Sequence, residues 1–112
     1  MLYEYRQYFA MPGKMRELND RFRDHTTRLW KTHGFKEVGF FEAQFGDTNV
    51  LHYILQWDSA EQRQASWASF MTDPEWIAAR TKSEGQGPLV ARVHNELWVP
   101  TDYSARAKTG LI

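Results

Sequence analysis

Four stretches of the chain, rich in apolar residues and bounded by glycine, proline or polar loop residues, predict β-strands. The stretches are rich in aromatic and β-branched residues, which suit a pleated, half-buried surface. They cover residues 2–9, 35–45, 50–57 and 89–99. The segment from Gly46 to Asn49 separates the second stretch from the third and predicts a tight hairpin loop. Gly39 lies inside the second stretch, which predicts either a bulge or a group packed close to the backbone.

Three further segments show apolar residues at helical spacing, and their ends carry helix signals. They cover residues 14–33, 59–71 and 73–83. Gly34 follows the first segment at the position where helices commonly turn left-handed and end. Ser59, with Gln62 three residues later, fits a capping box at the start of the second. Asp73 and Pro74 predict the start of the third, because aspartate caps a helix and proline suits its first position.

The order of the elements is strand, helix, strand, strand, helix, strand, if the last two helical segments are counted as one interrupted helix. This order is typical of the ferredoxin-like βαββαβ fold. It predicts an α+β domain in which a four-stranded antiparallel sheet carries both helices on one face. We expect the domain to span residues 1–100 and a C-terminal tail without a clear period to span residues 101–112.

The sheet face without helices must meet either water or a partner. A face that met water would carry mostly polar residues. Instead, both parities of the strands offer large apolar groups, such as Phe40 and Phe41 or Ile54 and Leu55. This pattern predicts a homodimer that packs sheet against sheet across a two-fold axis. The alternative is that the tail and the loops cover part of that face.

The composition narrows the class of protein further. The chain has 112 residues and a mass of 13.2 kDa, which suffices for one domain with its own core. It contains no cysteine, and this excludes disulfides, thiolate zinc sites, iron–sulfur clusters and cysteine nucleophiles. Its 14 basic and 14 acidic residues cancel, so charge gives no indication of binding to nucleic acid or to anionic membranes.

The sequence shows no signal for export, membrane insertion or cofactor binding. The first residues lack the basic and apolar regions of a signal peptide. No apolar run approaches the roughly 20 residues that span a bilayer. These observations predict a cytoplasmic protein without membrane insertion. Glycine-rich phosphate loops, nucleophile elbows and HxxxH or HExxH spacings are absent, so we expect neither a cofactor nor a metal site.

Candidate ligand-binding residues gather around the first strand. Glu4, Arg6 and Tyr8 share one of its faces, and Tyr53 on the third strand joins them if it follows the same parity. The helices offer mostly apolar groups, against which buried charges would be costly. We therefore expect these residues on the face without helices, together with Phe41, where Arg6 would bind a carboxylate. The alternative is that Glu4 and Arg6 pair only with each other and set the strand register.

Histidines and tryptophans offer further chemistry, each with a structural alternative. His94 and Glu96 share a strand face, so they form either a general base or a structural hydrogen bond. His33 ends the first helix, where a cation suits the helix dipole. Trp30 and Trp76 lie in helical segments and are predicted to pack in the core. None of these patterns identifies a catalytic residue.

Several motifs, taken in order, resemble the NIPSNAP family over residues 2–100. The motifs are Tyr3-Glu4-Tyr5-Arg6-Gln7-Tyr8, Pro12-Gly13-Lys14, His33-Gly34-Phe35, Val38-Gly39-Phe40-Phe41, Gly46-Asp47, Asp73-Pro74-Glu75-Trp76 and Asn95-Glu96. The resemblance implies a dimeric α+β barrel in which two ferredoxin-like sheets enclose a central space. It implies no settled enzymatic activity. Related barrel families include cofactor-free monooxygenases, which is an analogy at the level of the fold alone.

One position departs from the family pattern. In the third strand the family usually has histidine, then an apolar residue, then tryptophan, whereas this chain has Tyr53, Ile54 and Leu55. His52 comes one place earlier and therefore on the opposite face. Tyr53 would replace the imidazole as a hydroxyl donor but not as a base near neutral pH.

These observations lead to one functional hypothesis and two alternatives. The hypothesis is a homodimer of uncharacterised activity that binds a small, partly apolar molecule in its barrel pocket. The first alternative is a non-enzymatic interaction or scaffold domain whose interior is filled by side chains. The second is a cofactor-independent enzyme resembling the monooxygenases. A cavity of a few hundred Å³ beside Arg6 and Tyr8 favours the ligand-binding hypothesis.

Overall fold

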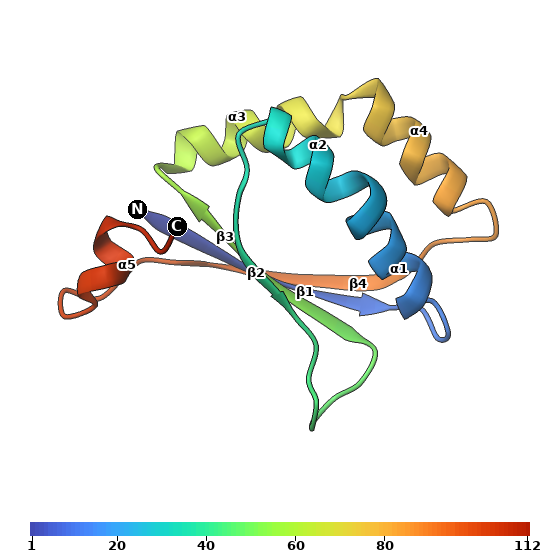
Figure 1. Ribbon diagram of the computed structural model, residues 1–112, viewed down its shortest axis with the longest axis horizontal. Helices are drawn as coiled ribbons and strands as arrows, with labels where there is room; N and C mark the ends of the chain where they lie inside the picture. The colour runs from blue at the N-terminus through green and yellow to red at the C-terminus, as the bar shows by residue number, and fades with distance from the viewer.

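A computed structural model describes residues 1–112 and has the expected α+β architecture. Its antiparallel sheet has the strand order β2–β3–β1–β4. The strands are β1 (Leu2–Ala10), β2 (Lys36–Phe41), β3 (Val50–Trp57) and β4 (Val90–Trp98). The helical segments are α1 (Met15–Arg21), η1 (Phe22–Thr26), α2 (Thr27–Thr32), α3 (Ala60–Met71), α4 (Pro74–Ser83) and α5 (Ala105–Thr109). The helices from α1 to α4 lie on one side of the sheet, which confirms the predicted ferredoxin-like fold (Figure 1).

A π-helical turn, η1, interrupts the first helix. The backbone N–H of Thr27 donates to the Phe22 carbonyl, five residues earlier, and the Thr27 hydroxyl donates to the same carbonyl at 3.0 Å. A π turn accommodates an extra residue and so rotates the buried stripe of the helix. For this reason the neighbours Leu29 and Trp30 are both buried in α2. Gly34 follows with a φ of 81°, as the sequence predicts for the end of this helix.

The predicted caps of α3 and α4 are confirmed. The Ser59 hydroxyl accepts a hydrogen bond from the Gln62 amide at 3.1 Å. The Asp73 carboxylate accepts one from the Glu75 amide at 2.8 Å, with Pro74 in the first turn. Both side chains satisfy amide groups that have no partner inside the helix. The sharp break between α3 and α4 lets both helices lie across the same sheet face.

The second strand is shorter than the sequence predicts. It ends at Phe41, so residues 42–49 form a hairpin loop longer than the tight turn expected. Phe45 in this loop is 90% exposed. The sequence predicts either a bulge at Gly39 or a group packed close to its backbone, and the structure has both. The register of β2 against β3 shifts between Glu37 and Gly39, and the Phe41 ring packs against Gly39. A Cβ at that position would lie only 2.8 Å from the Phe41 ring.

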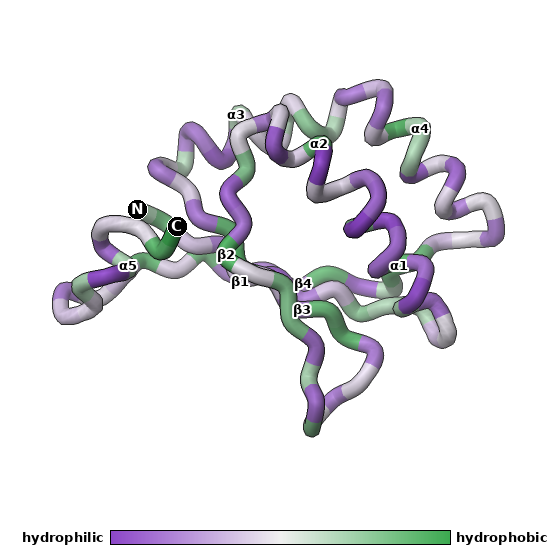
Figure 2. The backbone as a smooth tube through the Cα atoms, viewed as in Figure 1, coloured by the Kyte–Doolittle hydropathy of each residue, from purple (hydrophilic) through white to green (hydrophobic).

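Aromatic side chains dominate the core between the sheet and the helices. Trp30 stacks on Phe35 with ring centroids 4.7 Å apart. It also contacts the rings of Phe22, Phe40, Tyr53, Trp67 and Phe70. Figure 2 shows hydrophobic residues concentrated where the strands cross beneath the helices. None of the helices combines the length and apolar character that crossing a bilayer requires.

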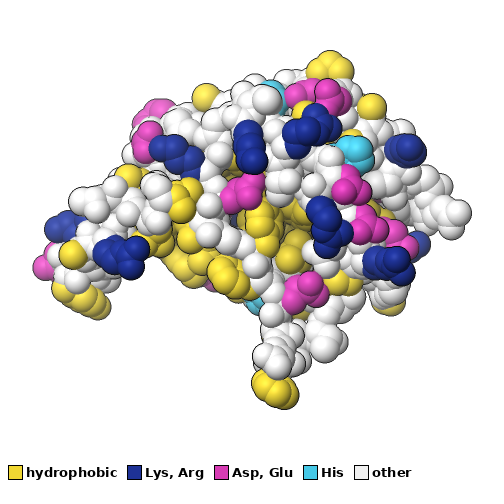
Figure 3. Space-filling view, in the orientation of Figure 1, with side chains coloured by type: hydrophobic (Ala, Val, Ile, Leu, Met, Phe, Trp, Pro, Cys, Tyr) yellow, Lys and Arg dark blue, Asp and Glu magenta, His cyan; other side chains and the backbone are white.

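The C-terminal tail folds back against one end of the sheet face that carries no helices. It contains the short helix α5, which the sequence pattern did not predict. The Tyr3 hydroxyl donates to the Ala107 carbonyl at 2.6 Å, and Gln56 accepts the Leu111 amide at 2.6 Å. The tail therefore covers Tyr3, which is buried, and leaves much of the remaining face open. Figure 3 shows hydrophobic side chains on the surface below the helices and at the tip of the hairpin.

Candidate functional site

Four of the five predicted ligand-binding residues lie together, but on the side of the sheet that faces the helices. Arg6 Nη1 donates to Glu4 Oε2 at 2.9 Å, and Arg6 Nε donates to the Tyr53 hydroxyl at 2.8 Å. Tyr8 lies beside them, with its hydroxyl 3.4 Å from Arg6 Nη2. The expectation that these residues face away from the helices is therefore wrong. Phe41 pairs with His52 on the opposite face and takes no part in this group.

The physical reason for this correction is the set of donors around Glu4. Its side chain is fully buried, yet it accepts six side-chain hydrogen bonds, three at each oxygen. Arg63 of α3 binds both oxygens, with Nε to Oε1 at 2.9 Å and Nη2 to Oε2 at 2.8 Å. The indole N–H groups of Trp57 and Trp67 each donate to Oε1 at 3.0 Å. The carboxylate is thus buried among donors and not against an apolar surface, which removes the expected cost.

The surroundings of Glu4 keep it ionised. Burial by itself raises the pKa of a carboxyl group, but the hydrogen bonds from Arg63 and Trp67 and the charge of Arg6 outweigh burial here. Together they lower the pKa of Glu4 to about 2. Glu4 is therefore a fixed anion that anchors β1 to α3.

Tyr53 has the opposite character. Its burial and the neighbouring Tyr8 raise its pKa well above the ordinary value of 10. The phenol therefore stays neutral near pH 7 and serves as a hydrogen-bonding group and not as a base. This agrees with the expectation that Tyr53, which stands where the family usually has histidine, donates a hydrogen bond but does not act as a base near neutral pH.

A cavity of about 300 Å³ adjoins Arg6 and Tyr8, between the sheet and the helices α3 and α4. We call it the inner cavity. Its lining is mostly apolar and aromatic, with three arginines and one glutamate: Arg6, Tyr8, Arg21, Trp67, Phe70, Met71, Trp76, Arg80, Glu84, Pro88, Val90 and Val93. Neither Glu4 nor Tyr53 lines it, so these two residues support Arg6 from behind.

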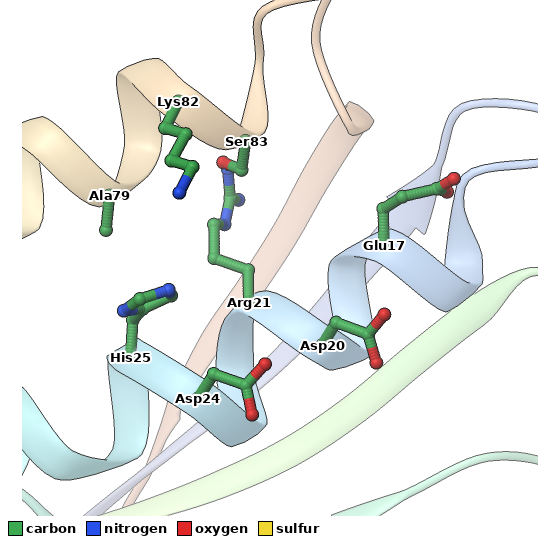
Figure 4. Close-up of a pocket in the computed structure, with 8 residues that line it drawn as sticks. All are labelled: Glu17, Asp20, Arg21, Asp24, His25, Ala79, Lys82 and Ser83. Carbon is green, nitrogen blue, oxygen red and sulfur yellow. The ribbon is translucent and has the colours of Figure 1, made fainter.

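Arg21 was not among the residues that the sequence pattern singled out. Arg21 is only 6% exposed, and its Nη1 donates to the Ser83 hydroxyl at 3.2 Å and to Glu84 at 3.1 Å. Figure 4 shows it reaching from α1 towards Ser83 of α4, while the Asp20 and Asp24 carboxylates point away from it. Arg21 therefore lies between two spaces: it lines the inner cavity and also a polar groove between α1 and α4, whose other lining residues are those labelled in Figure 4. A usable signal was its position three residues after Leu18, at the edge of the apolar stripe.

The histidines lie outside the inner cavity. His94 Nε2 pairs with Glu96 at 2.7 Å on the exposed sheet face, and His52 Nδ1 bonds the Tyr5 hydroxyl at 2.8 Å. His33 links α2 to the Asp73 cap at 2.6 Å, which agrees with a structural role. No group of three or more histidine, aspartate or glutamate side chains is arranged to hold a metal ion.

Comparison with known proteins decides the family. The family model described as NIPSNAP matches residues 3–105. The chain belongs to the NIPSNAP family. This NIPSNAP domain is 31% identical over 75 residues to the mouse protein NipSnap homolog 3B, a match that covers 66% of the chain and 30% of that relative. The chain thus spans less than a third of the curated relative that it matches.

Solved NIPSNAP structures share the fold of this domain. A NIPSNAP family protein with unknown function from Agrobacterium tumefaciens is 25% identical, with a TM-score of 0.80 and coverage of 93% of this chain and 91% of that one. An uncharacterized NIPSNAP domain protein from Burkholderia xenovorans is 20% identical, with a TM-score of 0.79 and coverage of 92% and 97%. These similarities establish the fold and leave the activity of the domain open.

Proposed function

We propose that this NIPSNAP domain is a homodimer that binds a small, partly apolar molecule in the inner cavity. The observation that carries the proposal is the cavity of about 300 Å³ beside Arg6 and Tyr8, because an interaction domain with a filled interior would leave no such space. Its volume is at the lower end of the range for ligand pockets, and its apolar walls carry a few polar groups, as ligand sites typically do. The site lies on the helix side of each sheet and not between two sheets.

Ligand binding in the inner cavity is tested by a substitution that adds an aromatic ring at the opening of the cavity. Met71 lines the cavity and is 45% exposed, so Met71→Trp places a larger side chain at the opening. We expect this variant to lose the thermal stabilisation that ligands from a small-molecule library give the unmodified protein, since ligands that bind the folded state raise its apparent stability. Ile77→Trp is the matched control, because Ile77 is 50% exposed on α4 and lies outside the cavity. Equal responses of the two variants would contradict the proposal.

The dimer part of the proposal rests on the sheet face without helices. Phe41, Tyr5, Ile54 and Trp98 lie on this face, and Phe41 is 55% exposed. Leu55 shares the parity of Tyr53 and was therefore expected on this face, but it lies on the helix side, is buried and does not contribute. Apolar groups exposed on one face of a sheet are typical of a protein–protein contact.

We expect light scattering to give a mass near twice the 13.2 kDa of the chain. Phe41→Arg would reduce this mass towards that of a monomer, because it places a charge in the contact. Phe45→Arg is the matched control, since Phe45 is 90% exposed at the hairpin and does not lie on the sheet face. A stable monomer of the unmodified protein at micromolar concentration would rule out the dimer.

A further inference from the structure

Two neighbouring side chains in the wall of the inner cavity carry N–H groups that no protein atom uses. The Nε of Arg21 and the Nε1 of Trp76 are both buried without a hydrogen-bond partner. Arg21 is 6% exposed and Trp76 is 7% exposed, and the Arg21 guanidinium lies 5.3 Å from the centre of the Trp76 ring. Buried donors without partners are rare in folded proteins and call for an explanation.

Arg63 provides a comparison within the same chain, because it binds a carboxylate through one edge of its guanidinium group. Its Nε and Nη2, which form one edge of the guanidinium, bind the two oxygens of Glu4 side by side. Arg21 has the same edge, but both of its hydrogen bonds use Nη1. The planar edge that matches a carboxylate is therefore unused in Arg21.

The charges around the inner cavity favour an anion. Arg6, Arg21 and Arg80 line it, and Arg63 lies behind Arg6 against Glu4. Only two carboxylates pair with these four arginines. Glu4 binds Arg6 and Arg63, and Glu84 at the rim binds Arg21 and Arg80. Each arginine therefore has a carboxylate partner, but the four arginines carry two more charges than the two carboxylates, and this positive excess favours an anionic ligand.

We propose that the inner cavity takes a small organic acid with an aromatic or branched apolar body, whose carboxylate is bound by the Nε–Nη2 edge of Arg21 and by the Trp76 indole N–H. The apolar body packs against the rings of Tyr8, Trp67 and Phe70. Because the two unused nitrogens are sealed from water, binding includes a side-chain rotation at the cavity wall, which is a common change when ligands bind. This inference rests on the proposed function, and it adds the ligand class and the two residues that select it.

The test compares an acid with its neutral amide, 2-naphthylacetate and 2-naphthylacetamide, by calorimetric titration of the purified full chain. We expect the acid to bind at least about tenfold more tightly than the amide, because a hydrogen bond to a charged group contributes more than a neutral one. Arg21→Lys keeps the charge but removes the planar edge, so it should weaken acid binding by about tenfold and leave amide binding unchanged. Arg28→Lys is the matched control, because the Arg28 side chain is 56% exposed, pairs with Glu75 of α4 and lies outside the cavity, so little change is expected.

Trp76→Phe provides a second variant, which keeps one aromatic ring and removes the indole N–H group together with part of the ring volume, a loss of packing that the acid and the amide share. It should weaken binding of the acid more than binding of the amide, and this result would stand even if Arg21→Lys failed to fold. Equal binding of acid and amide to the unmodified protein, reduced equally by Met71→Trp, would overturn this inference and leave the proposed function standing. Absence of binding by both probes, together with no stabilisation by the library, would overturn both.

Discussion

Replacing Glu4 with glutamine is expected to lower the free energy of unfolding by about 3–5 kcal/mol, because it leaves two partly buried arginines, Arg6 and Arg63, without their shared counter-charge. The glutamine side chain has nearly the same shape, but it puts an NH₂ group where one oxygen accepts three hydrogen bonds. A loss of this size is a large part of the stability of a typical small domain. Chemical denaturation at one fixed protein concentration measures it, since dimerisation would also affect apparent stability.

An exposed glutamate supplies the control for this substitution. Glu96 also accepts side-chain hydrogen bonds, from His94 and Trp98, but it lies on the open sheet face. Glu96→Gln should therefore change the stability little, because solvent screens such pairs. Similar losses for Glu4→Gln and Glu96→Gln would show that the cluster around Glu4 contributes no more than a surface interaction.

The stability lost in Glu4→Gln should also depend on pH. The pKa of Glu4 is lowered from 4.5 to about 2 in the folded protein, so its ionised form favours the folded state. This contribution is fully present above the unfolded pKa and is lost as the pH falls from 4.5 towards 2. The difference between the unmodified protein and Glu4→Gln should accordingly shrink across that range. A difference that stays constant from pH 6 to pH 2 would contradict the lowered pKa.

Replacing Trp30 with alanine is expected to lower the free energy of unfolding by about 3–5 kcal/mol as well. Trp30 is almost completely buried and contacts six other aromatic rings, so its removal would leave a large cavity in the core. Thermal and chemical denaturation both measure the loss. A small loss would mean that the surrounding rings collapse into the space.

A comparison of two tryptophan-to-phenylalanine variants separates packing from hydrogen bonding. Trp30 and Trp57 are both buried, but only the Trp57 indole has a partner, Glu4. Trp57→Phe should therefore cost more than Trp30→Phe, by about 1.5–3 kcal/mol, the usual contribution of a hydrogen bond to a charged group. Equal losses would assign the whole effect to packing.

Local sequence patterns determined most of the elements and their order. These patterns involve residues within a few positions of one another: the composition of the strands, the caps at Ser59 and Asp73 and the left-handed Gly34. The same is true of the grouping of Glu4, Arg6 and Tyr8 on one face of β1, since alternation along a strand fixes it. The NIPSNAP resemblance over nearly the whole chain followed from the same local motifs, and the family match confirms it.

Only the tertiary structure decided that the face of β1 with Glu4, Arg6 and Tyr8 points towards the helices, and which side chains it contacts there. The donors that make burial of Glu4 favourable come from Trp57, Arg63 and Trp67, more than fifty positions along the chain. The inner cavity likewise combines residues of β1, α1, α3, α4 and β4, and the unused donors of Arg21 and Trp76 meet there. Local patterns report the cost of burying a charge but not the partners that offset it, because those partners become neighbours only when the chain folds.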